Sequence, residues 1–522
     1  MNLAALVQGH RGDSRALYED GTWHTWGELR HRAATTAASL VAFGVEPGDR
    51  VAVAWPTSVD FVVAYLAVLA TGGVAVPLNP NSPVAELVRE LEVVTPAALL
   101  AGGAAARCAT EVGDALTFSP LCVLPAAVPR PAPGAAAAGG GVVVPWEEFS
   151  GAVSGPSGPG ADAVLPVIER DEDEVAALLF TSGTSGSPRA AMLTHGNLGA
   201  NLRQMLALPG EIVRADDVSL AVVPLFHVFG LNVALGLALA SGAALILEER
   251  FDPAECLRTV RELDVTTVLG VPTMFAAWVA LAEGEPAAAG PGGLPGVRLA
   301  VSGAASLPAE VASRFESTFG VPVWQGYGLT EAAPAVSTSL GTGRNRPGSV
   351  GRPLPGVSVR LVDESGHDVL SGDPGEIWVR GPNVFPGYWR DPEASAEVLT
   401  ADGWLRTGDV GVIGEEGDLF VVDRRKDVVI VSGFNVYPGE VETVVGSLPG
   451  VAEAVVVGRP DPVSGETVEV VVVVAPGAEV SEEQVREHCG TRLARYKCPT
   501  TVRFVPELPH GLAGKALRRA LR

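Results

Sequence analysis

The feature that most constrains the fold is a regular alternation of short β-branched runs with longer helical patterns, from about residue 48 to residue 335. "DRVAVAWP" predicts a strand, "SVDFVVAYLAVLATG" a helix and "GVAVPL" a second strand. The same alternation returns around "SLAVVPL", "VTTVLGVP", "VRLAVSG" and "VPVWQGYG". Strands separated by helices imply βαβ crossovers and parallel sheets covered on both faces. Because ligands of such sheets bind beyond the carboxyl ends of the strands, we expect the chemistry in the loops that follow them.

Changes in composition divide the chain into parts. Its 522 residues are too many for one small core, so at least two domains are expected. Residues 125–162 are rich in Pro, Gly and Ala and predict a mobile surface insertion without catalytic content. Short strands and turn clusters predict a β-rich part at about 340–422. The predicted class is therefore α/β: doubly wound βαβ subdomains and this β-rich part over 1–422, then a small α+β domain over 423–522, with the boundary near Asp423.

The charge balance argues against two broad classes of partner. A formal net charge of -23 disfavours binding to nucleic acid and to anionic membranes, since both attract basic surfaces. The five cysteines show neither C-x-x-C pairs nor zinc-ligand spacing, which fits free thiols in a reducing compartment. The longest apolar run, "LNVALGLALASGAALIL" (231–247), is short for a membrane span and predicts a buried helix running into a strand. Since the N-terminus shows no signal sequence, we expect a soluble, cytoplasmic protein without a membrane span.

The stretch "FTSGTSGSPRAAMLTH" (180–195) follows an apolar run and combines glycines, hydroxyl side chains and Arg189. Glycines let backbone amides approach an anion closely, and the hydroxyls offer donors or a ligand for Mg²⁺. The spacing is not that of a Walker A loop. "MLTHGNL" at its end is expected to start a helix. Taken alone, the stretch is compatible with a phosphate-binding loop and with a plain surface loop.

Four further segments carry side chains suited to nucleotide chemistry. In "QGYGLTE", Tyr327 offers a flat ring in an open loop for stacking on a base, and Glu331 offers an oxygen ligand for Mg²⁺. Asp409 ends "GWLRTGD", where it can accept hydrogen bonds from ribose hydroxyls. His227 lies among apolar residues in "PLFHVFG", and Lys515 lies in the basic tail "GLAGKALRR". Each also has a purely structural explanation, such as an aromatic plug in a turn, a satisfied core histidine or an exposed lysine at the chain end.

Taken in order, these segments resemble one family. "TSGTSGSPR", "PLFHVFG", "QGYGLTE", "GYW", "GWLRTGD", "DRRKDVVIVSGFNVYPGEVE" and the late "GK" are similar to motifs of the adenylate-forming (AMP-binding) enzymes over nearly the whole chain, and most like fatty-acyl-CoA ligases. The resemblance implies two steps: a carboxylate attacks the α-phosphate of ATP to give acyl-AMP and pyrophosphate, and the thiol of coenzyme A then displaces AMP. It implies ATP, Mg²⁺ and coenzyme A, with a small carboxylic acid as the substrate.

The resemblance also implies roles for individual residues. The phosphate loop would comprise Thr181, Ser182, Gly183, Thr184, Ser185, Gly186 and Arg189. The other nucleotide and coenzyme contacts would be Gln325, Gly326, Tyr327, Gly328, Thr330, Asp409, Arg424, Ser432 and Gly433. The acyl pocket would include His227, Phe229, Gly303, Ala304 and Gly328. The catalytic residues would be Lys515, His227, Thr184 and Glu331. Thr184 and Glu331 would bind magnesium, and Lys515 would contact the reacting carboxylate. Asp423 would be the hinge of the small domain.

The chain departs from the family pattern at the phosphate loop and at the tail. The loop usually reads P-K-G, and here it is Pro188-Arg189-Ala190. Arginine keeps the charge but presents a planar fork, and alanine is awkward only if that position needs φ > 0. The tail reads "AGK" where "SGK" or "TGK" is commoner, so a hydroxyl beside Lys515 is lost.

The absence of an acidic residue near "PLFHVFG" indicates the kind of acyl group that the protein would accept. Amino-acid-activating relatives place an aspartate near "PLFHVFG", whereas "PLFHVFGLNVALGLALA" holds no acidic residue. We therefore expect an apolar, fatty-type acyl group, with aryl acids and short dicarboxylates left open. Two alternatives remain: an acyl-AMP ligase or adenylation enzyme that loads a carrier protein, and an inactive nucleotide-binding scaffold.

Overall fold

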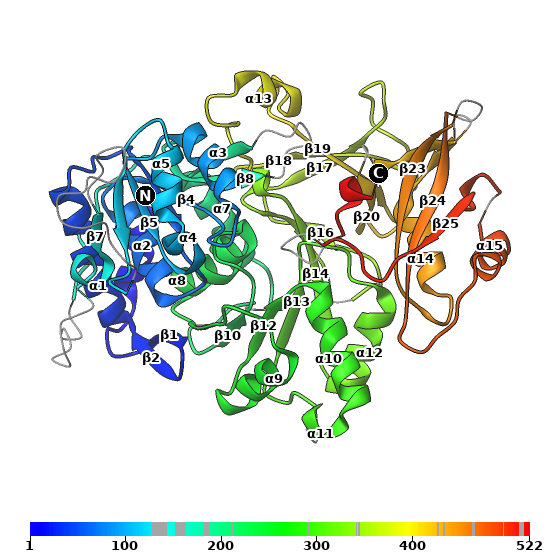
Figure 1. Ribbon diagram of the computed structural model, residues 1–522, viewed down its shortest axis with the longest axis horizontal. Helices are drawn as coiled ribbons and strands as arrows, with labels where there is room; N and C mark the ends of the chain where they lie inside the picture. Colours follow the sequence, from blue (N-terminus) through cyan, green and yellow to red (C-terminus); the bar gives the residue numbers. More distant parts are fainter. Residues whose placement is uncertain are drawn as a thin grey trace.

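The computed structural model describes residues 1–127, 143–151, 163–181, 188–210, 212–289, 293–340, 342, 345–424, 427–431, 434–461, 465–493, 495–510 and 516–521. Two large sheets and a four-stranded sheet build the N-terminal part, and a five-stranded sheet builds a separate C-terminal domain, drawn in orange and red in Figure 1. The predicted α/β class with a small C-terminal domain is confirmed.

The first large sheet has the strand order β7-β6-β5-β3-β4-β8-β9. Its strands are β3 (Arg50–Ala54), β4 (Val74–Pro77), β5 (Ala98–Ala101), β6 (Leu121–Leu124), β7 (Val143–Pro145), β8 (Val175–Thr181) and β9 (Arg189–Thr194). Neighbouring strands are parallel except β8 and β9, which form an antiparallel pair. The crossover helix α2 (Val59–Ala70) is apolar on nearly every side, and all of its residues but Asp60 are buried.

The second large sheet has the order β16-β15-β14-β13-β12-β10-β11-β1-β2. Its strands are β1 (Arg15–Glu19), β2 (Thr22–Thr25), β10 (Val218–Ala221), β11 (Ala244–Leu247), β12 (Thr267–Gly270), β13 (Leu299–Ser302), β14 (Val323–Gly328), β15 (Ala335–Thr338) and β16 (Arg352–Pro353). The middle strands are parallel, while β2, β15 and β16 run antiparallel to their neighbours. The sheet is therefore mixed, with antiparallel pairs at both edges.

Helices cover both faces of this second sheet. On one face Leu220, Val268 and Ala300 pack with α9 (Pro253–Glu262), α10 (Pro272–Gly284) and α12 (Ala309–Phe319). On the other face Leu269, Leu299 and Val301 share a core with α7 (His195–Leu206), the π-helix η2 (Phe229–Gly236) and α8 (Leu237–Ser241). The run 231–247 is thus a buried helical segment followed by strand β11, as predicted.

The remaining helices of the large domain precede the first strand or lie between strands. These are η1 (Leu3–Gly9), α1 (Trp26–Ala42), α3 (Val84–Val94), α4 (Gly103–Arg107), α5 (Ala109–Ala115), α6 (Trp146–Phe149), α11 (Pro286–Ala289), η3 (Thr330–Ala332) and α13 (Pro392–Val398). Capping side chains mark some of their starts: the Thr25 hydroxyl accepts from Glu28 N at α1, and Thr194 and Asn197 form the same reciprocal cap at α7.

Two expectations about local structure were wrong and one was confirmed. Residues 143–149, predicted to belong to a surface insertion, form β7 and α6, because Trp146 and Phe149 are buried in the core. The helix start predicted in "MLTHGNL" is confirmed, since α7 begins at His195 directly after strand β9, which pairs with β8. Tyr327 lies within β14 and not in an open loop, because β15 turns back and pairs Ser337 with it.

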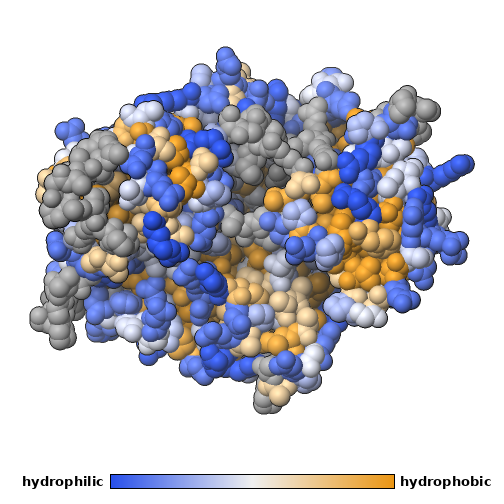
Figure 2. Space-filling view, in the orientation of Figure 1, coloured by the Kyte–Doolittle hydropathy of each residue, from blue (hydrophilic) through white to orange (hydrophobic). Residues whose placement is uncertain are grey.

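The β-rich part and the C-terminal domain follow along the chain. The four-stranded antiparallel sheet consists of β17 (Ser358–Val362), β18 (Gly375–Arg380), β19 (Leu405–Ile413) and β20 (Leu419–Arg424). The C-terminal sheet has β21 (Val429–Val431), β22 (Phe434–Val436), β23 (Val451–Asp461), β24 (Gly465–Val474) and β25 (Thr501–Phe504), with α14 (Pro438–Gly446), α15 (Glu482–Gly490), η5 (Arg495–Lys497) and η6 (Arg518–Ala520). Figure 2 shows hydrophobic residues gathered over this domain, on the right of the view.

Two global expectations can be compared with the described residues. All five cysteines are free thiols. Among the residues that the structure covers, none of the helices combines the length and the apolar character that crossing a bilayer requires.

Candidate active site

A cavity of about 1860 Å³ lies at the carboxyl ends of β12, β13 and β14. The segment 302–304 after β13 and the segment 326–331 at the end of β14 both line it. Residues 406–409 of β19 line it from the β-rich part, and residues 516–518 line it from the C-terminal tail. Segments that are far apart in the sequence therefore meet at the carboxyl ends of the parallel strands, which is where sheets of this type bind their ligands.

Tyr327 and Asp409 meet at this cavity. The Tyr327 phenol donates a hydrogen bond of 2.7 Å to Oδ2 of Asp409. Asp409 lies on β19, opposite Arg424 of β20, and is 8% exposed. The aromatic ring is thus fixed at the cavity wall by a buried carboxylate, whose hydrogen bonds to hydroxyl donors are of the strong, charge-assisted type.

Glu331 is held by Tyr388. The Tyr388 phenol donates to Oε1 of Glu331 at 2.7 Å, and both residues line the cavity. Burial and the adjacent Glu331 carboxylate raise the pKa of the Tyr388 phenol, so it remains a donor at neutral pH. Glu331 lies on η3, directly after β14, and its backbone carbonyl accepts from Phe385 N at 2.9 Å. The carboxylate is therefore positioned from two sides of the chain.

The phosphate loop is described only at its two ends. Ser182, Gly183, Thr184, Ser185 and Gly186 lie outside the described residues, while Thr181 ends β8 and Arg189 begins β9. β8 and β9 pair at Thr181 and Arg189, so the intervening segment is a connection between two antiparallel strands. Thr181, Pro188 and Arg189 all line the cavity.

Arg189 lies near two carboxylates and one aromatic ring. Its Nη2 lies 3.4 Å from Glu397 Oε2, and its Nε lies 3.8 Å from Asp391 Oδ2. Its guanidinium carbon lies 5.7 Å from the centre of the Tyr388 ring, close enough for a cation–π contact. Ala190, the other departure from the family loop, is buried in strand β9 and is not among the described residues with positive φ, so alanine causes no strain there.

The chain's last described segment is fastened to the predicted hinge. Arg518 Nη1 donates to Oδ1 of Asp423 at 3.1 Å, and Arg518 Nη2 donates to both carboxylate oxygens of Glu442 at 2.8 and 2.7 Å. Asp427 is 3.5 Å from the same guanidinium. Burial raises the pKa of Glu442, and the charge of Arg518 partly opposes that rise. Ala516 and Leu517, which follow Lys515, line the cavity, whereas Lys515 itself lies outside the described residues.

An apolar pocket extends from the cavity across one face of the second sheet. We define it as the part lined by β10, β12, β13, α7, the loop after α7, η2 and α8. His227 lines the cavity, and burial lowers the pKa of its imidazole ring, which keeps the ring neutral at pH 7. A Cβ on Gly303 would lie 3.1 Å from Cζ of Phe229, so the absence of a side chain makes room for this ring.

Most predicted site residues that are described meet at the cavity. These are Thr181, Arg189, His227, Phe229, Gly303, Ala304, Gly326, Tyr327, Gly328, Thr330, Glu331 and Asp409. Gln325 does not line it: its side chain is buried and accepts from Leu307 N at 3.3 Å. The side chain of Arg424 and the residues Ser432 and Gly433 lie outside the described part. Asp423 lies near the end of β20 and is part of the Arg518 network.

Sequence reasoning missed several residues of the cavity wall. Tyr388 was present in the quoted segment "GYW", and Arg406 and Thr407 in "GWLRTGD", but nothing in the sequence alone indicated their contacts. Glu86 and Glu90 of α3 also line the cavity, and only their helical spacing of four residues marks a shared face.

Two family models cover most of the chain. The model described as AMP-binding enzyme matches residues 4–389, and the model described as AMP-binding enzyme C-terminal domain matches residues 440–515. The chain belongs to the AMP-binding enzyme family. The resemblance inferred from the motifs is thereby confirmed, and with it the class of AMP-forming acid–thiol ligases at the level of the family.

Curated members of the AMP-binding family are similar over nearly the whole chain. A long-chain-fatty-acid–CoA ligase of Bacillus subtilis is 34% identical, covering 98% of this chain and 91% of the relative. A feruloyl-CoA synthase of an Amycolatopsis species is 38% identical, covering 97% and 95%. Among solved structures, ATP-bound MatB from Rhodopseudomonas palustris matches with a TM-score of 0.86 and 33% identity, covering 100% of this chain and 98% of that one. The relatives thus share the reaction class but differ in the acid that their names state.

Proposed function

We propose that the protein is an ATP-dependent carboxylate–CoA ligase for an uncharged, apolar carboxylic acid. One observation carries this proposal: the Tyr327–Asp409 pair, Glu331, His227 and the residues of the apolar pocket all line a single cavity. Such a cavity brings a nucleotide and an acid together in one site. The acid would attack the α-phosphate of ATP and release pyrophosphate, and the thiol of coenzyme A would then displace AMP and form the thioester.

The nucleoside end of the cavity supports the binding of ATP. Asp409 has a carboxylate that can accept hydrogen bonds from ribose hydroxyls, and Tyr327 presents a ring to the base. Arg189 lies at the end of the phosphate loop and brings a positive charge to that side of the cavity. We assign the charge of Arg189 to the polyphosphate, since carboxylate and triphosphate repel each other and catalysis depends on charge stabilisation at the reacting phosphate.

Glu331 fits the role of a magnesium ligand. Mg²⁺ in nucleotide enzymes is commonly held by one or two carboxylates together with the phosphates of the substrate. Glu331 lines the cavity and is oriented by the phenol of Tyr388, as a ligating carboxylate usually is by a second group. When bound, the ion would neutralise charge on the polyphosphate. Tyr388 would keep the carboxylate aimed into the cavity, and Thr184 would complete the pair that the family resemblance implies.

The tail supports a role for Lys515 in the first step only. Arg518 fastens the tail to Asp423, and Ala516 and Leu517 line the cavity, so residue 515 precedes a segment that lies at the active site. We assign Lys515 to the reacting carboxylate and α-phosphate, and Asp423 to the hinge about which residues 423–522 would turn. That turn would withdraw Lys515 and admit the pantetheine thiol along 431–438.

The chemistry of the pocket supports an uncharged acid. Its described lining comprises Met205, Leu208, Ile212, Val213, Phe229, Val233, Ala234, Leu237, Ala238, Leu269, Leu299 and Val301, together with the hydroxyls of Ser219, Thr267 and Ser302. No charged side chain from these described elements faces the pocket, so a second carboxylate or an ammonium group on the acid would be buried without a counter-charge. Burying an unpaired charge is strongly unfavourable. Fatty and aryl acids both meet this requirement.

Pyrophosphate release with a panel of acids tests the proposal. The panel contains saturated acids of several lengths, arylpropanoic and cinnamic acids, malonate as the doubly charged control and an amino acid as the cationic control, each with and without coenzyme A. We expect release and an acyl-CoA product with apolar acids alone. Release without thioester in the presence of coenzyme A would instead identify an enzyme that loads a carrier protein. Release with none of the acids would identify a nucleotide-binding scaffold.

A further inference from the structure

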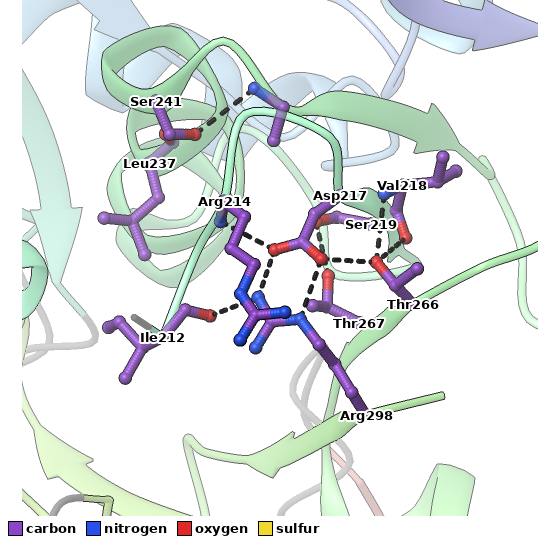
Figure 3. Close-up of polar contacts among 11 residues, drawn as sticks. Ile212, Arg214, Asp217, Val218, Ser219, Leu237, Ser241, Thr266, Thr267 and Arg298 are labelled. Atoms are coloured by element: carbon purple, nitrogen blue, oxygen red, sulfur yellow. Dashed lines mark hydrogen bonds and ion pairs between the residues drawn. The ribbon is translucent and has the colours of Figure 1, made fainter. Parts of the chain in front are cut away.

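Two of the three hydroxyl side chains that line the pocket, those of Ser219 and Thr267, lie next to each other on neighbouring strands. Ser219 of β10 and Thr267 of β12 both line the cavity and are 5% and 2% exposed. Their hydroxyls are hydrogen-bonded to each other across the two neighbouring strands, as Figure 3 shows. Leu269, Leu299, Val233 and Leu237 form the apolar lining around them.

The register of the sheet places this pair at the far end of the pocket. Ser219, Thr267 and Leu299 are opposite one another on β10, β12 and β13, and Leu269 and Val301 form the next row on the same face. Gly303, beside Phe229 at the carboxyl end of β13, is four residues beyond Leu299, which corresponds to about 13 Å at about 3.3 Å per residue. The pair is therefore remote from the reacting carboxylate.

The ion pair behind these hydroxyls is already satisfied. Arg298 donates to both oxygens of Asp217, with Nε at 2.9 Å from Oδ1, and Thr266 Oγ1 donates to Oδ1 at 2.7 Å (Figure 3). Burial would raise the pKa of Asp217, but the hydrogen bonds from Arg298 and Thr266 lower it overall, so the carboxylate stays ionised and paired. Asp217 and Arg298 do not line the cavity. Among the described residues, the far end of the pocket thus presents neutral hydroxyls and no charged side chain.

The number of hydroxyl hydrogens in the Ser219–Thr267 pair determines what the pair can still bind. Two hydroxyls carry two O–H donors, and their mutual hydrogen bond uses one of them. One donor and several lone pairs remain, next to the apolar side chains of Leu269 and Leu299. A buried hydroxyl donor without an acceptor is unfavourable, so an acid that offers an oxygen there should bind better than one that offers only carbon.

We propose that Ser219 and Thr267 recognise an uncharged oxygen, a hydroxyl or a ketone, at the end of the substrate acid that is farthest from its carboxyl group. This assignment rests on the proposed carboxylate–CoA ligase function and narrows its substrate class. The acid has an apolar body, which would lie along the row of Leu269 and Val301, and a hydrogen-bonding oxygen at its tip, which would reach the row of Ser219 and Thr267. The alternative is a cross-strand hydroxyl pair that only stabilises the sheet.

Matched pairs of acids test the proposal. The pairs are 3-(4-hydroxyphenyl)propanoate with 3-phenylpropanoate, 4-hydroxycinnamate with cinnamate, 8-hydroxyoctanoate with octanoate, and 7-oxooctanoate with octanoate. The measured quantity is the ratio of kcat/KM between the two members of each pair, from pyrophosphate release. We expect at least one hydroxyl or ketone pair to show a preference of about tenfold or more for the oxygenated member, because a site built to bond an oxygen rejects the analogue that lacks it.

Thr267→Val removes the hydroxyl while keeping the shape of the side chain, and Ser219→Ala removes the other one. Both variants should bring the ratio close to one while retaining activity on the unsubstituted acid, which shows that they fold. Leu299→Val, in the same row, is the matched control: it changes volume without polarity and should leave the ratio as in the wild type. A wild-type ratio near one in every pair, or a ratio that survives both hydroxyl substitutions, overturns the proposal while leaving the ligase function intact. Absence of pyrophosphate release with all acids refutes the ligase function itself, and the inference with it.

Discussion

The hydrogen bond between Tyr327 and Asp409 makes a quantitative prediction about nucleotide binding. In Asp409→Asn the side chain keeps its size, and the amide oxygen can still accept from the Tyr327 phenol that lies 2.7 Å from Oδ2. The substitution removes the negative charge that strengthens hydrogen bonds from the ribose hydroxyls to residue 409. The substitution therefore separates the binding of the nucleotide from the position of the ring.

The magnitude follows from the type of hydrogen bond. Hydrogen bonds to charged groups contribute about 1.5–3 kcal/mol, and a neutral acceptor retains roughly half of that. Asp409 is only 8% exposed, so solvent screens it little. Since about 1.4 kcal/mol corresponds to a factor of ten, the KM for ATP should rise by about three- to tenfold in Asp409→Asn and by about ten- to a hundredfold in Asp409→Ala.

The assay compares ATP with 2′-deoxy-ATP and 3′-deoxy-ATP in pyrophosphate release at saturating acid. The wild type should discriminate against at least one deoxy analogue, and Asp409→Ala should lose that discrimination while the KM for the acid stays nearly constant. Tyr327→Phe is the matched control, because it removes the same hydrogen bond from the other side and keeps the ring; it should preserve the discrimination. An unchanged KM for ATP in Asp409→Ala, or an equal rise in the KM for the acid, would refute the ribose assignment.

Three further predictions concern the tail, the phosphate loop and one buried acid. Lys515→Ala should abolish adenylation but largely spare thioester formation from supplied acyl-adenylate; equal loss of both half-reactions would contradict its role. Arg189→Lys should raise the KM for ATP by at most about thirtyfold, because its two partly exposed ion pairs contribute at most about 1 kcal/mol each. A loss beyond a hundredfold would show that the planar fork is essential. Burial, with Glu86 nearby, raises the pKa of Glu90 to about 7 from 4.5, so the native state should lose stability as the pH rises from about 4.5 to 7, by up to about 3 kcal/mol. In thermal unfolding, Glu90→Gln should then exceed the wild type in Tm at pH 8 and match it at pH 5; equal values at pH 8 would show that burial does not perturb this carboxyl.

Much of the fold could be predicted because its strands and helices have strong local patterns. The parallel strands β3, β4, β10, β12 and β13 and the helix α2 match the runs that predicted them. The errors arose where pairing partners lie far away in the chain. Nothing local in "QGYG" shows that β15 returns to pair with it, and a Pro- and Ala-rich surrounding conceals that Trp146 and Phe149 belong to the core.

The same limit applies to the site. Tyr327, Glu331 and Asp409 were found because each lies in a segment that resembles a known motif, and the structure brings them to one cavity. Tyr388 and the Ser219–Thr267 pair were missed, because their relevance depends on contacts with Glu331 and with the pocket that only the folded chain creates. Residue type and spacing alone do not encode such contacts.

The Arg518 network has a mechanical consequence. Asp423, Asp427 and Glu442 all converge on one guanidinium, so the segment that follows Lys515 is clamped to the very strand end that we propose as the pivot. Because these ion pairs lie at the proposed hinge, the tail and the C-terminal domain would move as one rigid body. Rotation about Asp423 would then withdraw Lys515 in the same motion that turns the domain, and the tail would not have to dissociate in a separate step. One hinge would therefore control when the enzyme passes from the first half-reaction to the second.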